Sequence, residues 1–265
     1  MFSYLDPFTS VYLLLVCALL GLVMGSALNC LAWRIVHKEK WSGGRSRCVH
    51  CGHPLKAADL VPLFSYLFLK GRCRYCGEKI SGRYPASEAA LAIVYISLLL
   101  RYDLTLETLE LMILCSSLFC LTLTDLDEQI IPDRFHLIGI AARFLYLLAM
   151  FGFRTEFLNA AWYSLWHGLL LGGSVLLLSL VMDKVLHKDS MGGGDIKLLF
   201  VLGLYFDLPC CFLLLILACI LGIVLAYTLG AKKSIAFPFG PALAVAAWLT
   251  LLFGAPLTGW YLSLF

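Results

Sequence analysis

The feature that most constrains this chain is a series of long apolar segments, several of them close to the ~20 residues that a helix needs to cross a bilayer. Only 14% of the residues are charged, against about a quarter in an ordinary globular protein, so lipid is the main solvent. The net charge of +3 is too small to indicate a nucleic-acid partner. We therefore predict an all-α polytopic membrane protein of about eight transmembrane helices, over residues 10–33, 85–100, 108–124, 135–153, 160–182, 196–206, 208–230 and 238–262.

The segment 196–206 is the shortest of these. It either merges with the next segment across Asp207, Leu208 and Pro209, or forms a short helix beside a cavity. Two glycine patterns, Gly21-x-x-x-Gly25 and the trio Gly168, Gly172 and Gly173, are typical of helices that pack closely in a membrane.

The distribution of Lys and Arg predicts the orientation. Eleven of the twenty lie between residues 34 and 84. On a count of eight helices, most of the others lie on the same side: Arg134, Lys184, Lys188, Lys197, Lys232 and Lys233. The opposite side has only Arg101 and Arg154, while Arg143 lies within a span. Because positive residues collect on the cytoplasmic side, we expect the loop 34–84 to be cytoplasmic and both termini to be outside.

Four cysteines in this loop form two CxxC pairs: Cys48, Cys51, Cys73 and Cys76. Gly52 and Gly77 follow the pairs and allow the tight turns that a shared metal ion requires. Disulfides rarely persist in the cytoplasm, so zinc is favoured over two disulfides, with iron as a second alternative. Four thiolates complete the tetrahedral coordination of one zinc ion and leave no open position, which predicts a structural ion. His50 and His53 are then not needed as ligands, and we interpret them as solvated residues.

Two aspartates lie at the same membrane boundary. Asp125 directly follows the segment 108–124, and Asp195 follows Gly192–Gly194 just before the segment 196–206. Ionisable groups at such places are costly and often mark function. Two carboxylates that share a proton can activate water and polarise a peptide carbonyl, which is the minimal apparatus of aspartic peptide hydrolysis. A proton-coupled transporter and a non-enzymatic assembly protein, whose zinc loop docks a partner, are the alternatives.

The remaining acids near this boundary receive structural interpretations. We interpret Asp133, which follows Pro132, as a helix N-cap, and Asp127 and Glu128 as solvated charges. Asp195 by itself also occupies a cap-like position. The helix dipole disfavours charge on Asp125 and favours charge on Asp195, so we expect Asp125 to carry the shared proton and Asp195 to be the base.

These motifs together resemble the type IV prepilin peptidase family, membrane aspartic proteases of the GxGD type. The resemblance covers nearly the whole chain. It runs through Gly21-x-x-x-Gly25-Ser26-x-x-Asn29, the loop from Cys48 to Glu88, Asp125 followed by Ile-Pro-Asp, Gly192-Gly-Gly-Asp195-Ile-Lys-Leu198 and Phe237-Pro-Phe-Gly-Pro241.

The resemblance implies a specific activity. Such enzymes cut the basic leader from prepilins or pseudopilins of pilus and secretion systems at the cytoplasmic face. Many then methylate the new N-terminal amine with S-adenosylmethionine. The matched catalytic residues are Asp125 and Asp195, and Gly71 and Arg72 match a segment linked to methyl transfer. No glycine-rich nucleotide fingerprint is visible in the loop, so a peptidase without methylation is a further alternative.

The resemblance also implies a domain organisation and a location. Residues 1–33 would form the first transmembrane helix, 34–84 the zinc loop and methyltransferase region, and 85–265 the peptidase core. The protein would be a multi-pass protein of the bacterial cytoplasmic (inner) membrane. Its partners would be lipid and prepilin precursors, without nucleic acid. The loop acids Asp59 and Glu78 could read the basic leader, although we interpret both as solvated surface charges.

Overall fold

The computed structural model describes residues 6–40, 45–187, 191–228 and 237–264, so Lys188, Lys232 and Lys233 lie outside the described residues. Within these ranges the secondary structure is helical, apart from two isolated β-bridges in the cysteine loop. The predicted all-α fold is therefore confirmed. The chain divides into two compact units, residues 1–108 and 109–265, which are described separately.

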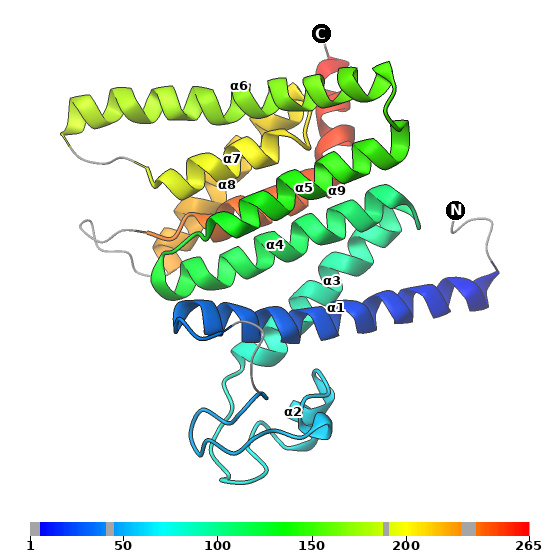
Figure 1. The fold of residues 1–265 in the computed structure, drawn as a ribbon, viewed down its shortest axis with the longest axis vertical. Helices are drawn as coiled ribbons and strands as arrows, with labels where there is room; N and C mark the ends of the chain where they lie inside the picture. Colours follow the sequence, from blue (N-terminus) through cyan, green and yellow to red (C-terminus); the bar gives the residue numbers. More distant parts are fainter. Residues whose placement is uncertain (1–5, 41–44, 188–190, 229–236, 265) are drawn as a thin grey trace. The chain divides into compact units, whose positions relative to one another are not determined.

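The first unit contains two long helices, α1 (Pro7–Val36) and α3 (Arg83–Tyr102), joined by the cysteine loop (Figure 1). Asp6 caps α1, since its carboxylate accepts a hydrogen bond from the amide of Thr9. The two helices pack closely because a Cβ on Gly21 would lie only 2.5 Å from the Cα of Ala92. The predicted packing role of this glycine pattern is confirmed.

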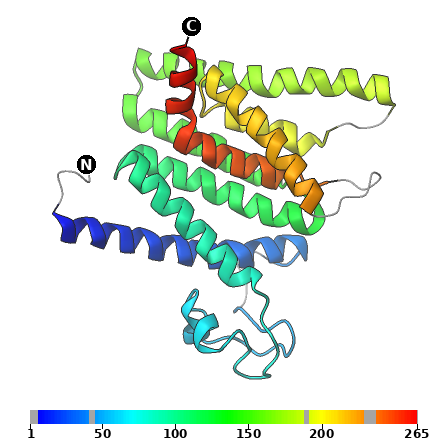
Figure 2. The ribbon, with the colours of Figure 1, turned by 180° about the vertical axis from the view of Figure 1, so that it is seen from behind.

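The first unit also holds the short helices η2 (Ala57–Asp59) and α2 (Phe64–Phe68), and the second unit contains the helices from α4 onward (Figure 2). They are α4 (Leu106–Glu128), whose first residues fall in unit one, α5 (Asp133–Phe151), α6 (Thr155–Leu186), α7 (Gly193–Gly203), α8 (Leu208–Thr228) and α9 (Gly240–Leu262). Fully buried leucines on α4, α7, α8 and α9 form the core: Leu114, Leu121, Leu199, Leu202, Leu214 and Leu243. These buried side chains hold α7 inside the helical bundle of this unit.

Seven of the described helices are long and apolar enough to cross a membrane: α1, α3, α4, α5, α6, α8 and α9. The eighth predicted segment, 196–206, becomes α7, whose 11 residues extend only about 16 Å. It does not merge with α8, because Asp207 accepts a hydrogen bond from the amide of Cys210 and begins the next helix. The count of eight full spans is thus corrected to seven candidate spans and one short helix.

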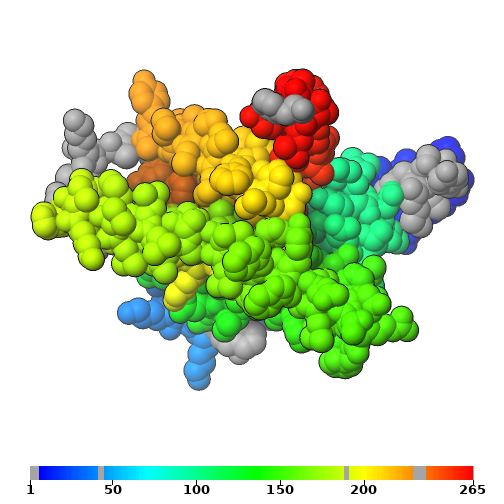
Figure 3. All heavy atoms as spheres, turned by 90° about the horizontal axis from the view of Figure 1, so that it is seen from above, coloured from blue at the N-terminus to red at the C-terminus, as the bar shows by residue number. Residues whose placement is uncertain are grey.

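Close backbone approach fixes α7 against α6. A Cβ on Gly203 would lie 2.8 Å from the Cα of Gly168, and one on Gly172 would lie 2.8 Å from the Cβ of Phe200. The packing role of Gly168 and Gly172 is confirmed, whereas a Cβ on Gly173 would meet nothing within 4 Å. Figure 3 shows α6 running across one face of this unit, where most of its outward side chains are exposed and apolar.

A polar cluster ties α4, α5 and α6 together inside the second unit. Arg143 lies 3.4 Å from buried Glu110 and 3.3 Å from the hydroxyl of Ser164. Next to it, Tyr205 donates a 2.7 Å hydrogen bond to the carbonyl of Gly139 on α5. Because Tyr205 lies two residues after the end of α7, this bond fixes the far end of the short helix.

Candidate active site and metal centre

Asp125 lies in the last turn of α4 and is only 4% exposed. The helix ends just beyond it, where Gln129 takes a left-handed conformation (φ +55°) ahead of Pro132. Its Oδ2 accepts a 2.9 Å hydrogen bond from the backbone amide of Gly240, the first residue of α9. A segment 115 residues away therefore supplies the charge-stabilising partner of this carboxylate.

Gly240 leaves no room for a side chain. A Cβ at this position would lie 2.8 Å from Oδ2 of Asp125 and 3.0 Å from a methyl group of Leu121. Gly240 belongs to the motif Phe237-Pro-Phe-Gly-Pro241, for which the sequence indicated no role. A glycine between Pro238 and Pro241 at the start of an apolar segment was the available signal.

Asp195 lies in the first turn of α7, three residues after the N-cap Gly192. It is therefore not the cap itself. A Cβ on Gly194 would lie 2.9 Å from the Cβ of Ile131, so this glycine lets α7 approach the segment that follows α4. The approach places the start of α7, which carries Asp195, beside the end of α4, which carries Asp125.

The environment of Asp195 favours its neutral form. Its Oδ1 is buried and has no hydrogen-bond partner among the described residues. Removing a carboxyl group from water disfavours its charged form. The two carboxylates thus differ: Asp125 has an amide donor, and Asp195 has a desolvated oxygen.

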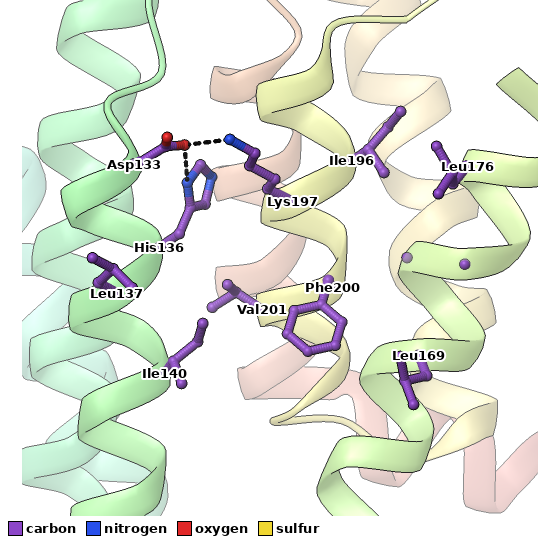
Figure 4. Close-up of a pocket in the computed structure, with 12 residues that line it drawn as sticks. Asp133, His136, Leu137, Ile140, Leu169, Leu176, Ile196, Lys197, Phe200 and Val201 are labelled. Atoms are coloured by element: carbon purple, nitrogen blue, oxygen red, sulfur yellow. Dashed lines mark hydrogen bonds and ion pairs between the residues drawn. The ribbon is translucent and has the colours of Figure 1, made fainter. Parts of the chain in front are cut away.

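A second group of charges lies beside the first turn of α7 (Figure 4). Oδ1 of Asp133 lies 2.7 Å from the ammonium of Lys197 and 3.6 Å from Nδ1 of the His136 ring. The predicted N-cap role of Asp133 is wrong, because Pro132 occupies the cap position and the Asp133 side chain faces α7 instead. Asp127 and Glu128 are exposed, as predicted.

The cysteine loop forms two similar turns. The amide of Cys48 donates to the carbonyl of His53, and that of Cys73 donates to the carbonyl of Glu78, which closes each turn. Gly52 and Gly77 take left-handed conformations in these turns, with φ of +70° and +75°. The expected need for glycine after each pair is confirmed.

The four thiols fit a zinc ion. Their sulfur atoms lie within 4.8 Å of one another, and those of Cys48 and Cys76 are 3.9 Å apart. Tetrahedral coordination at about 2.3 Å would put sulfur atoms about 3.8 Å apart. Although burial opposes it, the amides of Cys51 and His50 and the neighbouring thiols lower the pKa of Cys48 to about 6, which favours its thiolate. Against the amide of Glu78, burial and the neighbouring thiols raise the pKa of Cys76 to about 12. His53 lies against the ring of Tyr75 rather than in the cluster.

Asp59 is an internal anchor of this loop. It ends the short helix η2 (Ala57–Asp59), and its side chain is only 4% exposed. It accepts hydrogen bonds from Arg74 at 2.7 Å, Tyr75 at 3.0 Å and the amide of Lys56 at 3.1 Å. The interpretation of Asp59 as a solvated charge is therefore wrong, whereas Glu78 is exposed, as predicted.

Gly71 and Arg72 lie next to the second cysteine turn. Gly71 has a left-handed conformation (φ +67°), and the ring of Tyr66 covers it. Arg72 donates from its guanidinium to the carbonyl of Gly77 at 3.3 Å. After this loop, Glu88 on α3 accepts the amide of Leu63 at 2.8 Å, which attaches the loop to the helix. The role of Gly71 and Arg72 in methyl transfer stays a prediction.

Comparison with known proteins gives the family. A model of the bacterial peptidase A24 N-terminal domain matches residues 19–102, and a model of the type IV leader peptidase family matches residues 112–227. A prepilin leader peptidase/N-methyltransferase of Pseudomonas putida is 33% identical over an alignment of 274 positions, gaps included, that covers 92% of this chain and 91% of that protein. The chain belongs to the type IV leader peptidase family. Membership makes it an enzyme of the leader peptidase class.

Other members of the family are similarly close. A protein with the same name from Aeromonas hydrophila is 34% identical over 229 residues, covering 83% of this chain and 76% of the relative. One from Bacillus subtilis (strain 168) is 30% identical over 248 residues, covering 92% and 96%. No solved structure matches this chain.

Proposed function

We propose that this chain cuts the basic leader from prepilins or pseudopilins and then methylates the new N-terminal amine with S-adenosylmethionine. The names of its relatives contain both activities, and the similarity to them extends over most of the chain. The two matched family models cover both the loop and the helices that carry the aspartates.

Asp125 and Asp195 would perform the hydrolysis. An ionised Asp125 takes a proton from a water molecule, whose oxygen attacks the scissile carbonyl carbon. A protonated Asp195 donates a hydrogen bond and then its proton to the carbonyl oxygen. When the tetrahedral intermediate collapses, the C–N bond breaks and Asp125 returns its proton to the leaving amine. Asp195 regains its own proton as the carbonyl reforms.

This assignment reverses the one expected from the helix dipoles. A dipole contributes about 0.3–1 kcal/mol, whereas a hydrogen bond to a charged group contributes about 1.5–3 kcal/mol. The amide of Gly240 is directed at Asp125, while Oδ1 of Asp195 is desolvated. The observation that carries the proposal is this pair of unequal carboxylates at one site.

The active site would lie at the cytoplasmic face of a bacterial inner membrane. The dense Lys and Arg content of residues 34–84 supports this orientation. The precursor's leader would stay in the cytoplasm while its apolar segment remains among the helices. Precursor and lipid are then the partners, without nucleic acid.

Zinc would have a structural role. Four cysteine ligands leave no open coordination position, so the ion holds together a loop with little core of its own. Residues 34–84 would contribute the methyl-transfer region, including Gly71 and Arg72, and residues 85–265 the peptidase core. Residues 1–33 would anchor the loop in the membrane.

The test uses the purified protein in lipid with a synthetic precursor, with and without S-adenosylmethionine. Mass spectrometry reports loss of the leader and gain of a methyl group as separate mass changes. We expect cleavage in both reactions and methylation only with the methyl donor. Precursor that stays intact after incubation with the folded wild-type protein would overturn the peptidase proposal. Cleavage without a gain of the methyl group would overturn the methyltransferase part.

A further inference from the structure

A groove runs along α7 on the side away from the buried core. It has a volume of about 540 Å³, within the range of ligand sites, and lies among α5, α6 and α7. Figure 4 shows Leu137 and Ile140 on α5, Leu169 and Leu176 on α6, and Phe200 on α7 around it. Most of the groove is therefore apolar.

The length of the groove corresponds to about two turns of helix. Its lining residues on α5 extend from Asp133 to Ile140, and those on α6 from Leu169 to Leu176. Seven helical steps span about 10 Å. The groove is thus too short for a whole transmembrane segment but matches the first two turns of one.

Gly173 leaves the α6 wall open. It lines the groove, and a Cβ at this position would meet nothing within 4 Å. Its neighbour Gly172 differs, since its own packing against Phe200 excludes a side chain. Small residues on a membrane helix allow another helix to approach its backbone.

One end of the groove carries charge. Lys197 and His136 both contact Oδ1 of Asp133, which leaves Oδ2 outside these two contacts. The Asp133 and Lys197 side chains are 67% and 58% exposed. An exposed ion pair contributes little free energy, so Asp133 can share its carboxylate with an incoming cation.

The charged end adjoins the candidate active site. Ile196 and Lys197 line the groove, and Asp195 is the preceding residue. A Cβ on Gly193, at the start of α7, would also meet nothing within 4 Å. A chain that leaves the groove at this end can therefore cross the glycine turn toward the two aspartates.

We infer that this groove holds the first two turns of the precursor's apolar segment, with Asp133 facing a basic residue of the leader. The inference rests on the proposed function, in which cleavage occurs just before an apolar segment. The apolar walls and the carboxylate at the groove's end complement an apolar helix preceded by positive charge. The rest of the segment would lie in the bilayer.

The first test fills the groove. Gly173→Phe places a ring in the open space, and Leu177→Phe, at an exposed α6 position that does not line the groove, is the matched control. We expect Gly173→Phe to raise KM for the precursor about tenfold or more, with kcat changed less than KM, because burial of apolar side chains is lost. An unchanged KM in a folded Gly173→Phe protein would overturn the inference.

The second test needs no activity. A photoreactive benzoylphenylalanine replaces Leu176 in an Asp125→Asn background, and the same group at Leu177 is the control. We expect precursor adducts from position 176, at the first residues of the apolar segment, and few from position 177. Adducts with lipid alone at position 176 would show a lipid site instead and overturn the inference.

The third test addresses the charge. Asp133→Asn is assayed with a basic-leader precursor and with one whose leader Lys and Arg are replaced by Gln. We expect the variant to raise KM several-fold for the basic leader and not for the Gln leader, as in a double-mutant cycle. An equal change in KM for both precursors would show that Asp133 does not recognise the basic residues of the leader.

Failure of this inference is distinguishable from failure of the proposed function. If the wild-type protein does not cleave, the proposed function fails. If the wild-type protein cleaves while the groove variants behave like their controls, only the groove assignment fails.

Discussion

At the scale of residues, the site depends on how two identical side chains acquire different environments. Asp125 is buried at the end of α4 but receives the amide of Gly240. Asp195 has a desolvated oxygen without a partner among the described residues. The difference arises from what each carboxylate contacts, and in the proposed mechanism it makes Asp125 the base.

Replacing Gly240 tests the contact directly. A Cβ there would lie 2.8 Å from Oδ2 of Asp125, so Gly240→Ala must displace the carboxylate or the start of α9. We expect cleavage to fall about 100-fold, as misplacement by about 1 Å can cause. Gly259→Ala is the control on the same helix, because a Cβ there meets nothing within 4 Å, and it should cleave like the wild type. Equal rates for the two variants would contradict the role of Gly240.

The proton assignment can be read by infrared spectroscopy. We expect the resting enzyme to show the carbonyl band of a protonated carboxyl group that disappears in Asp195→Asn, because Asp195 is the desolvated member of the pair. The two groups titrate together, so the comparison of the two Asn variants is required. A band that persists in Asp195→Asn and disappears in Asp125→Asn would restore the assignment from helix dipoles.

Residue-level prediction depends on local signals. An aspartate beside a long apolar segment is unusual, which made Asp125 and Asp195 the candidates, and their catalytic role stays a prediction. The donor Gly240 lies 115 residues from Asp125, so no local pattern reveals the contact. Asp133 was misassigned for the same reason, since Pro-Asp before an apolar run resembles a cap, but Lys197, 64 residues away, binds its carboxylate.

At the scale of elements, the cysteine loop compensates for its small apolar core with metal ligands and a buried carboxylate. The two cysteine turns supply the ligands, and Asp59 joins η2 to Arg74 and Tyr75 in the second turn. The CxxC spacing predicted the metal cluster. The anchoring by Asp59 was not predictable, because an acid in a polar loop usually faces water.

Removing this anchor should weaken metal binding. We expect Asp59→Asn to lower zinc affinity about tenfold, the range found when the supports of metal ligands are removed. Glu78→Gln, an exposed acid in the same loop, is the control. Competition with a metallochromic chelator measures both. Equal affinities in the two variants would show that Asp59 does not support the cluster.

The pH dependence of zinc binding separates the thiols from Asp59. The bonds to Asp59 outweigh its burial and keep its pKa below 3.8, so its contribution is present above that value and is lost only as pH falls through the lowered pKa. The thiols need to be ionised to bind metal, so we expect zinc release between pH 7 and about 5, while Asp59 is still charged. Retention of zinc at pH 4 would contradict four-thiolate coordination.

The short helix α7 could be predicted from hydropathy only in part. Its apolar residues indicated a helix, and the alternative of a separate short helix is confirmed, with a groove rather than an enclosed cavity beside it. Its length was not fixed by hydropathy, because Asp207 and Pro209 begin a new helix within a continuous apolar stretch. Its position depends on backbone contacts between Gly168 and Gly203 that a single segment does not reveal.

At the scale of the whole molecule, the number of crossings determines where the termini lie. Seven candidate spans alone would place them on opposite sides. We propose that α7 and the residues before α8 together make one further crossing, which would restore an even number. Eight crossings put almost all Lys and Arg on one side, so we expect both termini outside. A C-terminal alkaline phosphatase fusion should be active, and a fusion within the loop 34–84 inactive. An inactive C-terminal fusion that is stably produced would contradict this topology.

The central claim is that Asp125 and Asp195 form one catalytic pair for leader cleavage. The most direct measurement compares two rates in the variants Asp125→Asn and Asp195→Asn. The first is cleavage of an intact precursor, and the second is methylation of a precleaved peptide with S-adenosylmethionine. The methylation rate shows whether each variant is folded. The account predicts at least about a thousandfold loss of cleavage in each variant with methylation of the precleaved peptide retained. Cleavage at the wild-type rate by either variant would contradict it.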